Sequence, residues 1–89
     1  MNSRRTKRFR TLYGRLPVTV QREADEAYRL WRQDPSLPGL DFKHIHPAHL
    51  GILSARVSGN YRVIGYELPN GDIVWDWIGT HSEYLKLPP

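Results

Sequence analysis

The feature that most constrains the fold is a run of three strand-like segments within residues 52–78. They are "ILSARV" (52–57), "YRVIGYEL" (61–68) and "DIVWDWI" (72–78), all rich in β-branched and aromatic residues. Asn70-Gly71, between the second and third segments, is the strongest short hairpin signal. Three consecutive strands with short turns predict an antiparallel meander, which needs a second layer to cover its apolar face.

The predicted hairpin registers decide which side chains share a face. A two-residue loop at Asn70-Gly71 gives the pairs Leu68 with Ile73, Tyr66 with Trp75 and Ile64 with Trp77. A three-residue loop at 58–60 pairs Arg56 with Arg62, whereas a two-residue Gly59-Asn60 loop would send the two arginines to opposite faces. With the three-residue loop, one face is apolar: Leu53, Ala55, Val57, Val63, Val74 and Ile78. The other is basic and aromatic: Ser54, Arg56, Arg62, Ile64, Tyr66, Trp75 and Trp77.

A helix precedes the meander and is the natural cover for the apolar face. Pro17 suits a first helical position. An apolar stripe follows at spacings of four, three and four: Val20, Ala24, Ala27 and Trp31. Asp34-Pro35 ends the helix, because the residue before a proline is pushed out of the α region. Residues 8–14 read as a short edge strand, and residues 40–46 as a strand or a short irregular piece. The chain is therefore expected to be α+β.

Composition and charge narrow the class of protein. The chain has 89 residues and no cysteine, so we expect one small domain in a reducing cytoplasm, without a disulfide scaffold. No apolar run approaches the roughly 20 residues that span a bilayer, and we expect no membrane partner. Nine of the thirteen Lys/Arg residues lie in residues 1–32, beside three acids. We read residues 1–7 as a flexible basic arm and 8–89 as the domain; such a patch attracts nucleic acid or an acidic protein.

A candidate proton-transfer pair follows the last strand. His81 and Tyr84 come directly after "WDWIG", and the strand alternation leads His81 towards the rim of the Arg56/Arg62 face. Imidazole can carry a proton at neutral pH, and guanidinium groups bind phosphate. RNA cleavage uses this combination: a base for the 2′-hydroxyl, cations for the charged transition state and an acid for the leaving oxygen. The alternative is structural, with His81 capping a turn and Tyr84 packed in the core.

Two further groups of residues are candidate substrate contacts. Trp75 and Trp77 would stack on unpaired bases, although two indoles in so small a domain are more often partial core. His44, His46 and His49 invite a zinc hypothesis, but Pro47 interrupts them and no acidic or cysteine partner stands beside them. We therefore expect no metal and no cofactor; one of these histidines is expected near the groove as a phosphate contact or alternative base, and His46 is taken as the substrate contact.

The ordered combination of segments resembles one family. A short strand, a helix ending in "DP", the "LxFK" of Leu40, Phe42 and Lys43, "ARVSGNYRVIG" (55–65) and "WDWIGTHSEY" (75–84) are similar to compact RelE-like members of the RelE/ParE superfamily of type II toxin–antitoxin toxins. The resemblance covers residues 9–87 and implies a twisted, mainly antiparallel four-stranded sheet with an N-terminal helix or helices on one face. It also implies a toxin that is silenced by a cognate antitoxin.

The resemblance further implies an activity and a site. RelE-like ribonucleases cut mRNA, usually on the ribosome, without a metal. By that similarity Arg56 and Arg62 match strand arginines, His81 and Tyr84 match a C-terminal catalytic pair, and Lys43 matches a preceding basic residue. Some relatives use a glutamate base, for which only the nearby Asp41 offers itself, and Ile52 and Ser54 replace lysines of the family.

Two other functions remain open at this point. ParE-type relatives inhibit DNA gyrase without cutting RNA, and they usually lack the histidine and tyrosine pair. A third reading is an inert scaffold derived from such a toxin, which would have no effect on growth.

Overall fold

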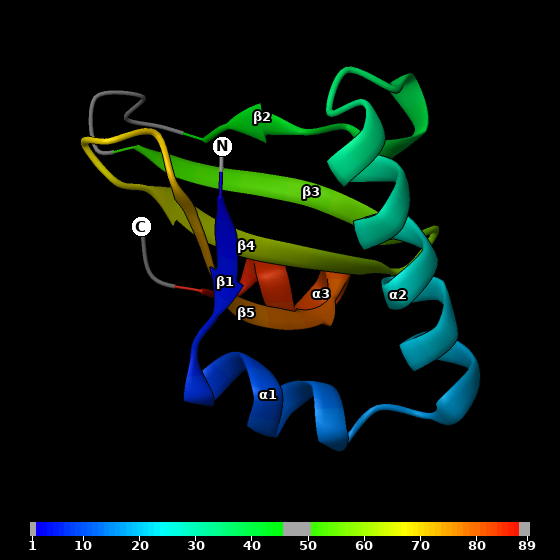
Figure 1. Ribbon diagram of the computed structural model, residues 1–89. Coiled ribbons are helices and arrows are strands. Elements are labelled where there is room, and N and C mark those ends of the chain that lie inside the picture. Colours follow the sequence, from blue (N-terminus) through cyan, green and yellow to red (C-terminus); the bar gives the residue numbers. More distant parts are fainter. Residues whose placement is uncertain (1, 46–50, 88–89) are drawn as a thin grey trace.

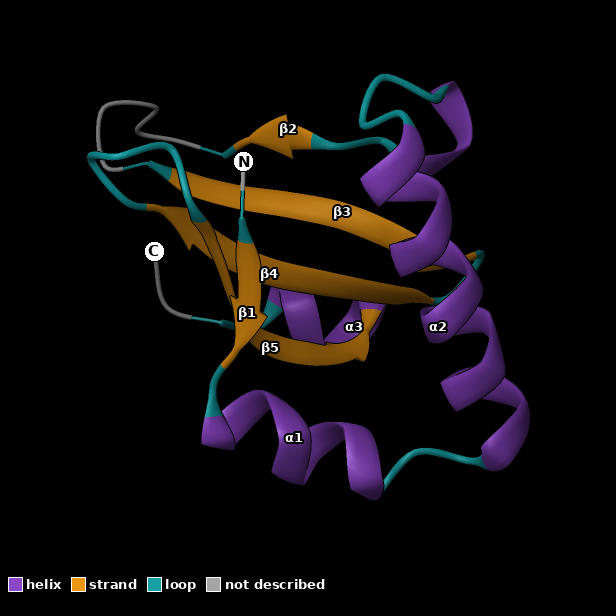
Figure 2. Cartoon of the chain, viewed as in Figure 1, coloured by secondary structure: helices purple, strands orange, loops and turns teal. Residues whose placement is uncertain are grey.

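A computed structural model describes residues 2–45 and 51–87. Within these residues the chain forms one mixed sheet of five strands in the order β1-β5-β4-β3-β2, with three α-helices around it (Figures 1 and 2). The strands are β1 (Ser3–Arg5), β2 (Lys43–His44), β3 (Ile52–Ser58), β4 (Tyr61–Glu67) and β5 (Ile73–Thr80). The helices are α1 (Lys7–Gly14), α2 (Val18–Gln33) and α3 (His81–Leu85), with a 3-10 turn, η1 (Pro38–Leu40), before β2.

The N-terminal residues differ from the prediction. Ser3–Arg5, expected within a flexible arm, form β1 and pair in parallel with Ile73–Trp75 of β5. Residues 8–14, expected as an edge strand, lie in α1, whose first turn is capped by Thr6: its hydroxyl accepts a hydrogen bond from the Phe9 N–H at 3.1 Å. The sheet is therefore five-stranded and mixed rather than four-stranded and antiparallel, because a β-strand 70 residues downstream supplies the partner for β1.

The predicted main helix is confirmed. α2 begins directly after Pro17 and ends at Gln33, before Asp34. The predicted stripe faces inward, with Val20, Ala24 and Trp31 buried. Trp31 packs edge-on against Phe42 and Trp75, with ring centroids 5.5 and 5.3 Å apart. α1 and α2 thus cover one face of the sheet and enclose the core (Figure 1). No helix among the described residues has the length and apolar character needed to cross a membrane.

The register of the β4–β5 hairpin differs from the prediction near the turn. Leu68 rather than Pro69 closes the turn: its N–H donates to the Asp72 carbonyl and its carbonyl accepts from the Gly71 N–H, both at 2.8 Å. Pro69 has no N–H, so it cannot close a two-residue loop. Gly71 adopts φ +89°, as a three-residue loop requires. Trp75 consequently pairs with Gly65 instead of Tyr66.

A β-bulge at Asp76 then restores the predicted pairing. Beyond the bulge, Ile64 lies opposite Trp77 as predicted, and Val63 opposite Ile78. The extra residue inverts the alternation of β5, so Trp75 faces the helices and Trp77 faces the other way. A second bulge, between Arg56 and Ser58, allows a two-residue turn at Gly59-Asn60 while keeping Arg56 opposite Arg62, as the three-residue loop predicted.

Candidate active site

The C-terminal helix α3 mounts a histidine and a tyrosine at the end of β5. Thr80 caps the helix: its hydroxyl accepts from the Glu83 N–H at 3.1 Å, and the Glu83 carboxylate accepts from the Thr80 N–H at 2.8 Å. The His81 N–H donates to the Asn60 carbonyl at 2.7 Å, which ties the helix start to the β3–β4 turn. His81 and Tyr84 lie one turn apart, and their rings stack with centroids 5.8 Å apart and planes 22° apart.

Arg62 of β4 lies beside this pair. Its guanidinium carbon is 5.3 Å from the centre of the Tyr84 ring, so Tyr84 contacts both the imidazole and the cation. The Arg62 residue is only 5% exposed. Its Nε and Nη2 donate to the hydroxyl of Ser54, at 3.0 and 2.9 Å, and Ser54 is fully buried. The opposing strands β3 and β4 therefore hold this guanidinium in one orientation.

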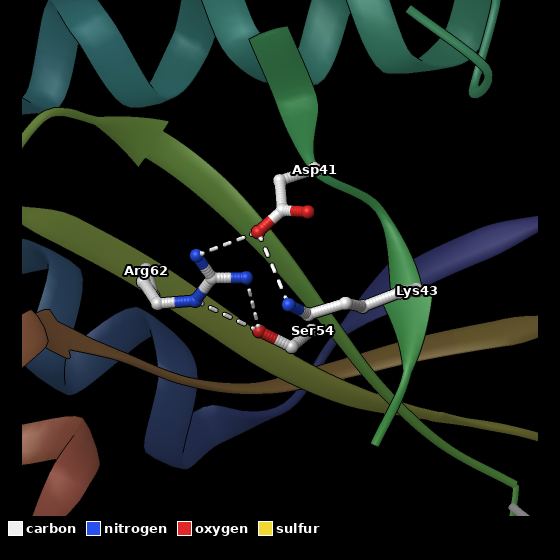
Figure 3. A network of polar contacts seen from close by, with 4 residues as sticks. All are labelled: Asp41, Lys43, Ser54 and Arg62. Carbon is white, nitrogen blue, oxygen red and sulfur yellow. Dashed lines mark hydrogen bonds and ion pairs between the residues drawn. The ribbon is translucent and has the colours of Figure 1, made fainter. Parts of the chain in front are cut away.

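The charge of Arg62 is balanced by Asp41, which follows η1 (Figure 3). The Asp41 Oδ2 atom accepts from Arg62 Nη1 at 3.2 Å and lies 3.3 Å from Lys43 Nζ. The hydrogen bond from Lys43, with a smaller contribution from Arg62, holds the pKa of Asp41 below its usual value. Asp41 is thus an ionised and weakly basic carboxylate at neutral pH, which argues against a role as general base.

The structure brings four of the predicted site residues into one chain of contacts: His81, Tyr84, Arg62 and, through Asp41, Lys43. The two strand arginines, Arg56 and Arg62, have different environments. Arg56 is opposite Arg62 in register but is exposed, and no hydrogen bond or ion pair joins it to another described side chain. Arg56 therefore takes no part in the contacts that join Arg62 to Asp41, Ser54 and Tyr84.

The predicted aromatic platform is wrong. Trp75 is 4% exposed and packs against Trp31 and Phe42 on the helix face. Trp77 faces away from the helices, but it is only 7% exposed. Its ring packs against Gly79 so closely that a Cβ on that residue would be 2.5 Å from the nearest ring carbon. Neither indole offers a face to a base. Predicted contact His46 lies outside the described residues.

Two residues of the site received no role from the sequence. The sequence identifies Asp41 only as an acid near the site, and Ser54 as a residue of the basic face that departs from a family pattern. The predicted register, which places Ser54 on the Arg62 face, was the available signal for Ser54. For Asp41 there was none, because its contact depends on a left-handed backbone conformation, φ 45° and ψ 43°.

The arrangement has the chemistry for binding and cleaving a phosphodiester. Two cations and one carboxylate give the Arg62–Asp41–Lys43 group a net positive charge, and the exposed imidazole of His81 stacks on Tyr84, which also contacts Arg62. Within residues 2–45 and 51–87, no three His, Cys, Asp or Glu side chains gather in a way that could hold a metal ion. His46 and His49 are outside that range.

Comparison with known proteins rests on structure. No protein-family model matches the sequence, and no curated protein is significantly similar to it. A chain of the RelB-RelE antitoxin–toxin complex from Methanococcus jannaschii superposes with a TM-score of 0.70 at 18% identity, covering 96% of this chain and 98% of that one. A chain of the toxin–antitoxin complex RelBE2 from Mycobacterium tuberculosis superposes with a TM-score of 0.69 at 22% identity, covering 90% of this chain and 96% of that one.

A third similar structure is YafQ from Escherichia coli, with a TM-score of 0.67 at 12% identity over 93% of this chain and 96% of that chain. All three likenesses extend over nearly the full length of both chains. The fold of this chain is therefore RelE-like.

Proposed function

We propose that this chain is the toxin of a type II toxin–antitoxin system and acts in the cytoplasm as a metal-independent endoribonuclease on mRNA bound to the ribosome. The fold supports the toxin role, and the structural neighbours include toxins crystallised with their antitoxins. The observation that carries the ribonuclease activity is the stack of His81 on Tyr84 and of Tyr84 on the buried guanidinium of Arg62. The partner is a cognate antitoxin with acidic and apolar residues.

The proposed reaction is attack of a 2′-hydroxyl on the adjacent phosphorus, with departure of the 5′-oxygen. Arg62 and Lys43 stabilise the negative charge that builds on the phosphate oxygens, and Arg56 adds positive charge. His81, an exposed side chain, either takes the proton of the 2′-hydroxyl or gives one to the departing 5′-oxygen, and water completes the other transfer. Tyr84 orients the imidazole and the substrate. Ser54 holds Arg62 in place.

The direct test compares growth and mRNA integrity after induced expression of wild type and His81→Ala. We expect the wild type to arrest growth and fragment mRNA, and His81→Ala to lower cleavage about 10²–10⁴-fold, the usual contribution of a general acid or base. His44→Ala is the matched control, since His44 is an exposed histidine whose hydrogen-bonding partner is Glu67, outside the site. A folded His81→Ala protein that remains fully toxic contradicts the assignment.

The same experiment separates a gyrase inhibitor from a nuclease. DNA supercoiling is measured in parallel with mRNA integrity in the induced cells. Growth arrest with intact mRNA and relaxed plasmid DNA would contradict the ribonuclease proposal in favour of a binding toxin. No arrest at all would contradict both.

A further inference from the structure

One carboxylate oxygen, that of Asp41, contacts both of the cations that would bind a phosphate group. Asp41 Oδ2 lies between the two cations that the proposed reaction needs, 3.2 Å from Arg62 Nη1 and 3.3 Å from Lys43 Nζ (Figure 3). An anionic oxygen bridging a guanidinium and an ammonium group is also the arrangement that a non-bridging phosphate oxygen adopts when bound by these side chains. A phosphodiester and Asp41 therefore compete for the same two donors.

Asp41 is not needed to hold Arg62 in position. Ser54 accepts hydrogen bonds from two nitrogens of the guanidinium, and the Tyr84 ring covers its face. These contacts come from β3 and α3, and they do not depend on the loop that carries Asp41. Of the five N–H groups of Arg62, three donate to Ser54 and Asp41. If Asp41 moved away, Arg62 would keep its orientation and present more donors to a ligand.

Asp41 is also placed so that it can leave. Its side chain is 35% exposed, whereas that of Arg62 is 7% exposed, and the Lys43 side chain is 53% exposed. Its backbone adopts the left-handed conformation, which is unfavourable for residues other than glycine and is tolerated best by Asn and Asp. The ion pair with two cations compensates for that backbone cost in the free protein.

We propose that the Asp41 carboxylate occupies, in the free protein, the place of a phosphate oxygen between Arg62 and Lys43, and that bound RNA displaces it. This inference rests on the proposed function, since it assigns the same site to RNA. Asp41 lowers the charge of the empty site, so that isolated anions bind weakly. A polynucleotide, which makes further contacts along its backbone, can still displace the carboxylate. Asp41 is thus a positioning residue that lowers the affinity of the site for every phosphate group, so that isolated anions stay unbound while RNA, with its further contacts, still binds.

The first test measures binding of inorganic phosphate and of a 2′-O-methyl RNA oligomer, which lacks the attacking hydroxyl. Asp41→Asn keeps the left-handed backbone and removes the charge. We expect it to bind both probes roughly five- to tenfold more tightly than wild type at low salt, with the gain shrinking at high salt. Glu23→Gln is the matched control, because it makes the same change in net charge on the exposed face of α2. It should leave both affinities unchanged.

Adding Lys43→Ala to Asp41→Asn should remove most of the gain, since Lys43 is then no longer available to the phosphate. An Asp41→Asn affinity that equals or falls below that of wild type would overturn the inference. So would an equal gain in Glu23→Gln, which would show that only the net charge matters.

A second measurement needs no substitution, which matters because Asp41→Asn removes a charge partner from a buried guanidinium. Phosphate is titrated into the wild-type chain, and the Asp41 carboxyl carbon and Arg62 Nε resonances are followed by NMR. Displacement predicts that both resonances shift with the same midpoint. A shift of Arg62 alone, or of neither, would overturn the inference.

Failure of the inference and failure of the proposed function have different signatures. Wild-type RNA cleavage with no gain in Asp41→Asn overturns only the role of Asp41. A wild-type chain that neither cleaves RNA nor arrests growth overturns the ribonuclease function, whatever the phosphate titration shows.

Discussion

At the scale of single residues, close contacts decide which positions tolerate change. Gly65 of β4 lies opposite Trp75, and a Cβ at this position would be 2.5 Å from the Val74 carbonyl oxygen and 2.7 Å from the Trp75 ring. The carbonyl belongs to the backbone of the neighbouring strand and cannot rotate away. The indole can cross β4 and pack against Trp31 because position 65 has no side chain. This glycine therefore shapes the aromatic core behind the site.

We predict that Gly65→Ala lowers the free energy of unfolding by about 1–3 kcal/mol, the usual cost of overpacking. In an ordinary strand the same change would be neutral or stabilising, because alanine loses less conformational entropy on folding than glycine does. Gly59→Ala is the control, since nothing lies within 4 Å of its Cβ position. Urea denaturation measures both variants; equal stability of Gly65→Ala and wild type would contradict the geometry of this contact.

At the scale of elements, α3 is a short helix whose position depends on its cap. None of its residues is buried, so packing contributes little to holding it against β4 and β5. The reciprocal hydrogen bonds of Thr80 and Glu83 form its first turn, and the bond from the Thr80 N–H is the main reason that the pKa of Glu83 lies below its ordinary value. The stacked His81 and Tyr84 rings depend on this turn for their positions.

We predict that Glu83→Ala weakens RNA cleavage and growth arrest, whereas Glu83→Gln preserves both. Glutamine can still accept the hydrogen bond from the Thr80 N–H, and alanine cannot. The loss of the cap costs about 1 kcal/mol, and most of it is local. Amide hydrogen exchange should accelerate across residues 81–85 in the alanine variant and elsewhere remain as in wild type. Identical behaviour of the two variants would show that the cap does not position the site.

At the scale of the whole molecule, the two faces of the sheet have different roles: one packs the core and the other carries the candidate site. The face under α1 and α2 holds the apolar core, and the opposite face carries Ser54, Arg62 and the contacts of α3. β1 closes the sheet at the edge of β5, where the Ile73 N–H donates to the Asn2 carbonyl at 2.9 Å and the Thr6 N–H to the Trp75 carbonyl at 3.0 Å. The first residues thus complete the sheet rather than serving only as a charged arm.

We predict that deletion of residues 1–5 lowers the free energy of unfolding by about 1–2 kcal/mol, through the loss of the β1 hydrogen bonds. For a domain of this size, that corresponds to a fall in melting temperature of roughly 5–15 °C. The double substitution Arg4→Gln/Arg5→Gln removes the charges and keeps the strand, so it should melt near wild type. If the deletion melts like wild type, these residues behave as the flexible arm that the sequence indicated.

Much of the fold and part of the site could be predicted from signals that are local in the chain. The bounds of α2 follow from Pro17 and Asp34-Pro35, and the meander follows from alternation and turn residues. The approach of His81 and Tyr84 to Arg62 is predicted by the strand register, which the bulge at Asp76 restores after the unpredicted three-residue turn.

The remainder depends on contacts between distant segments. Residues 7–14 are compatible with either a strand or a helix until the Thr6 cap and the packing against β5 select the helix. The bulge that sends Trp75 and Trp77 to opposite faces occurs at Asp76, whose carboxylate accepts from the Thr6 hydroxyl at 2.7 Å, 70 residues away.

The sequence by itself thus determined the layers, the main helix and the face on which the cations lie, because periodicity and turn chemistry act over a few residues. Only the tertiary structure decided that β1 joins the sheet, that Trp75 and Trp77 are both buried, and that Asp41 bridges Arg62 and Lys43. Each of these depends on hydrogen bonds or charges brought together by folding, which no local pattern records.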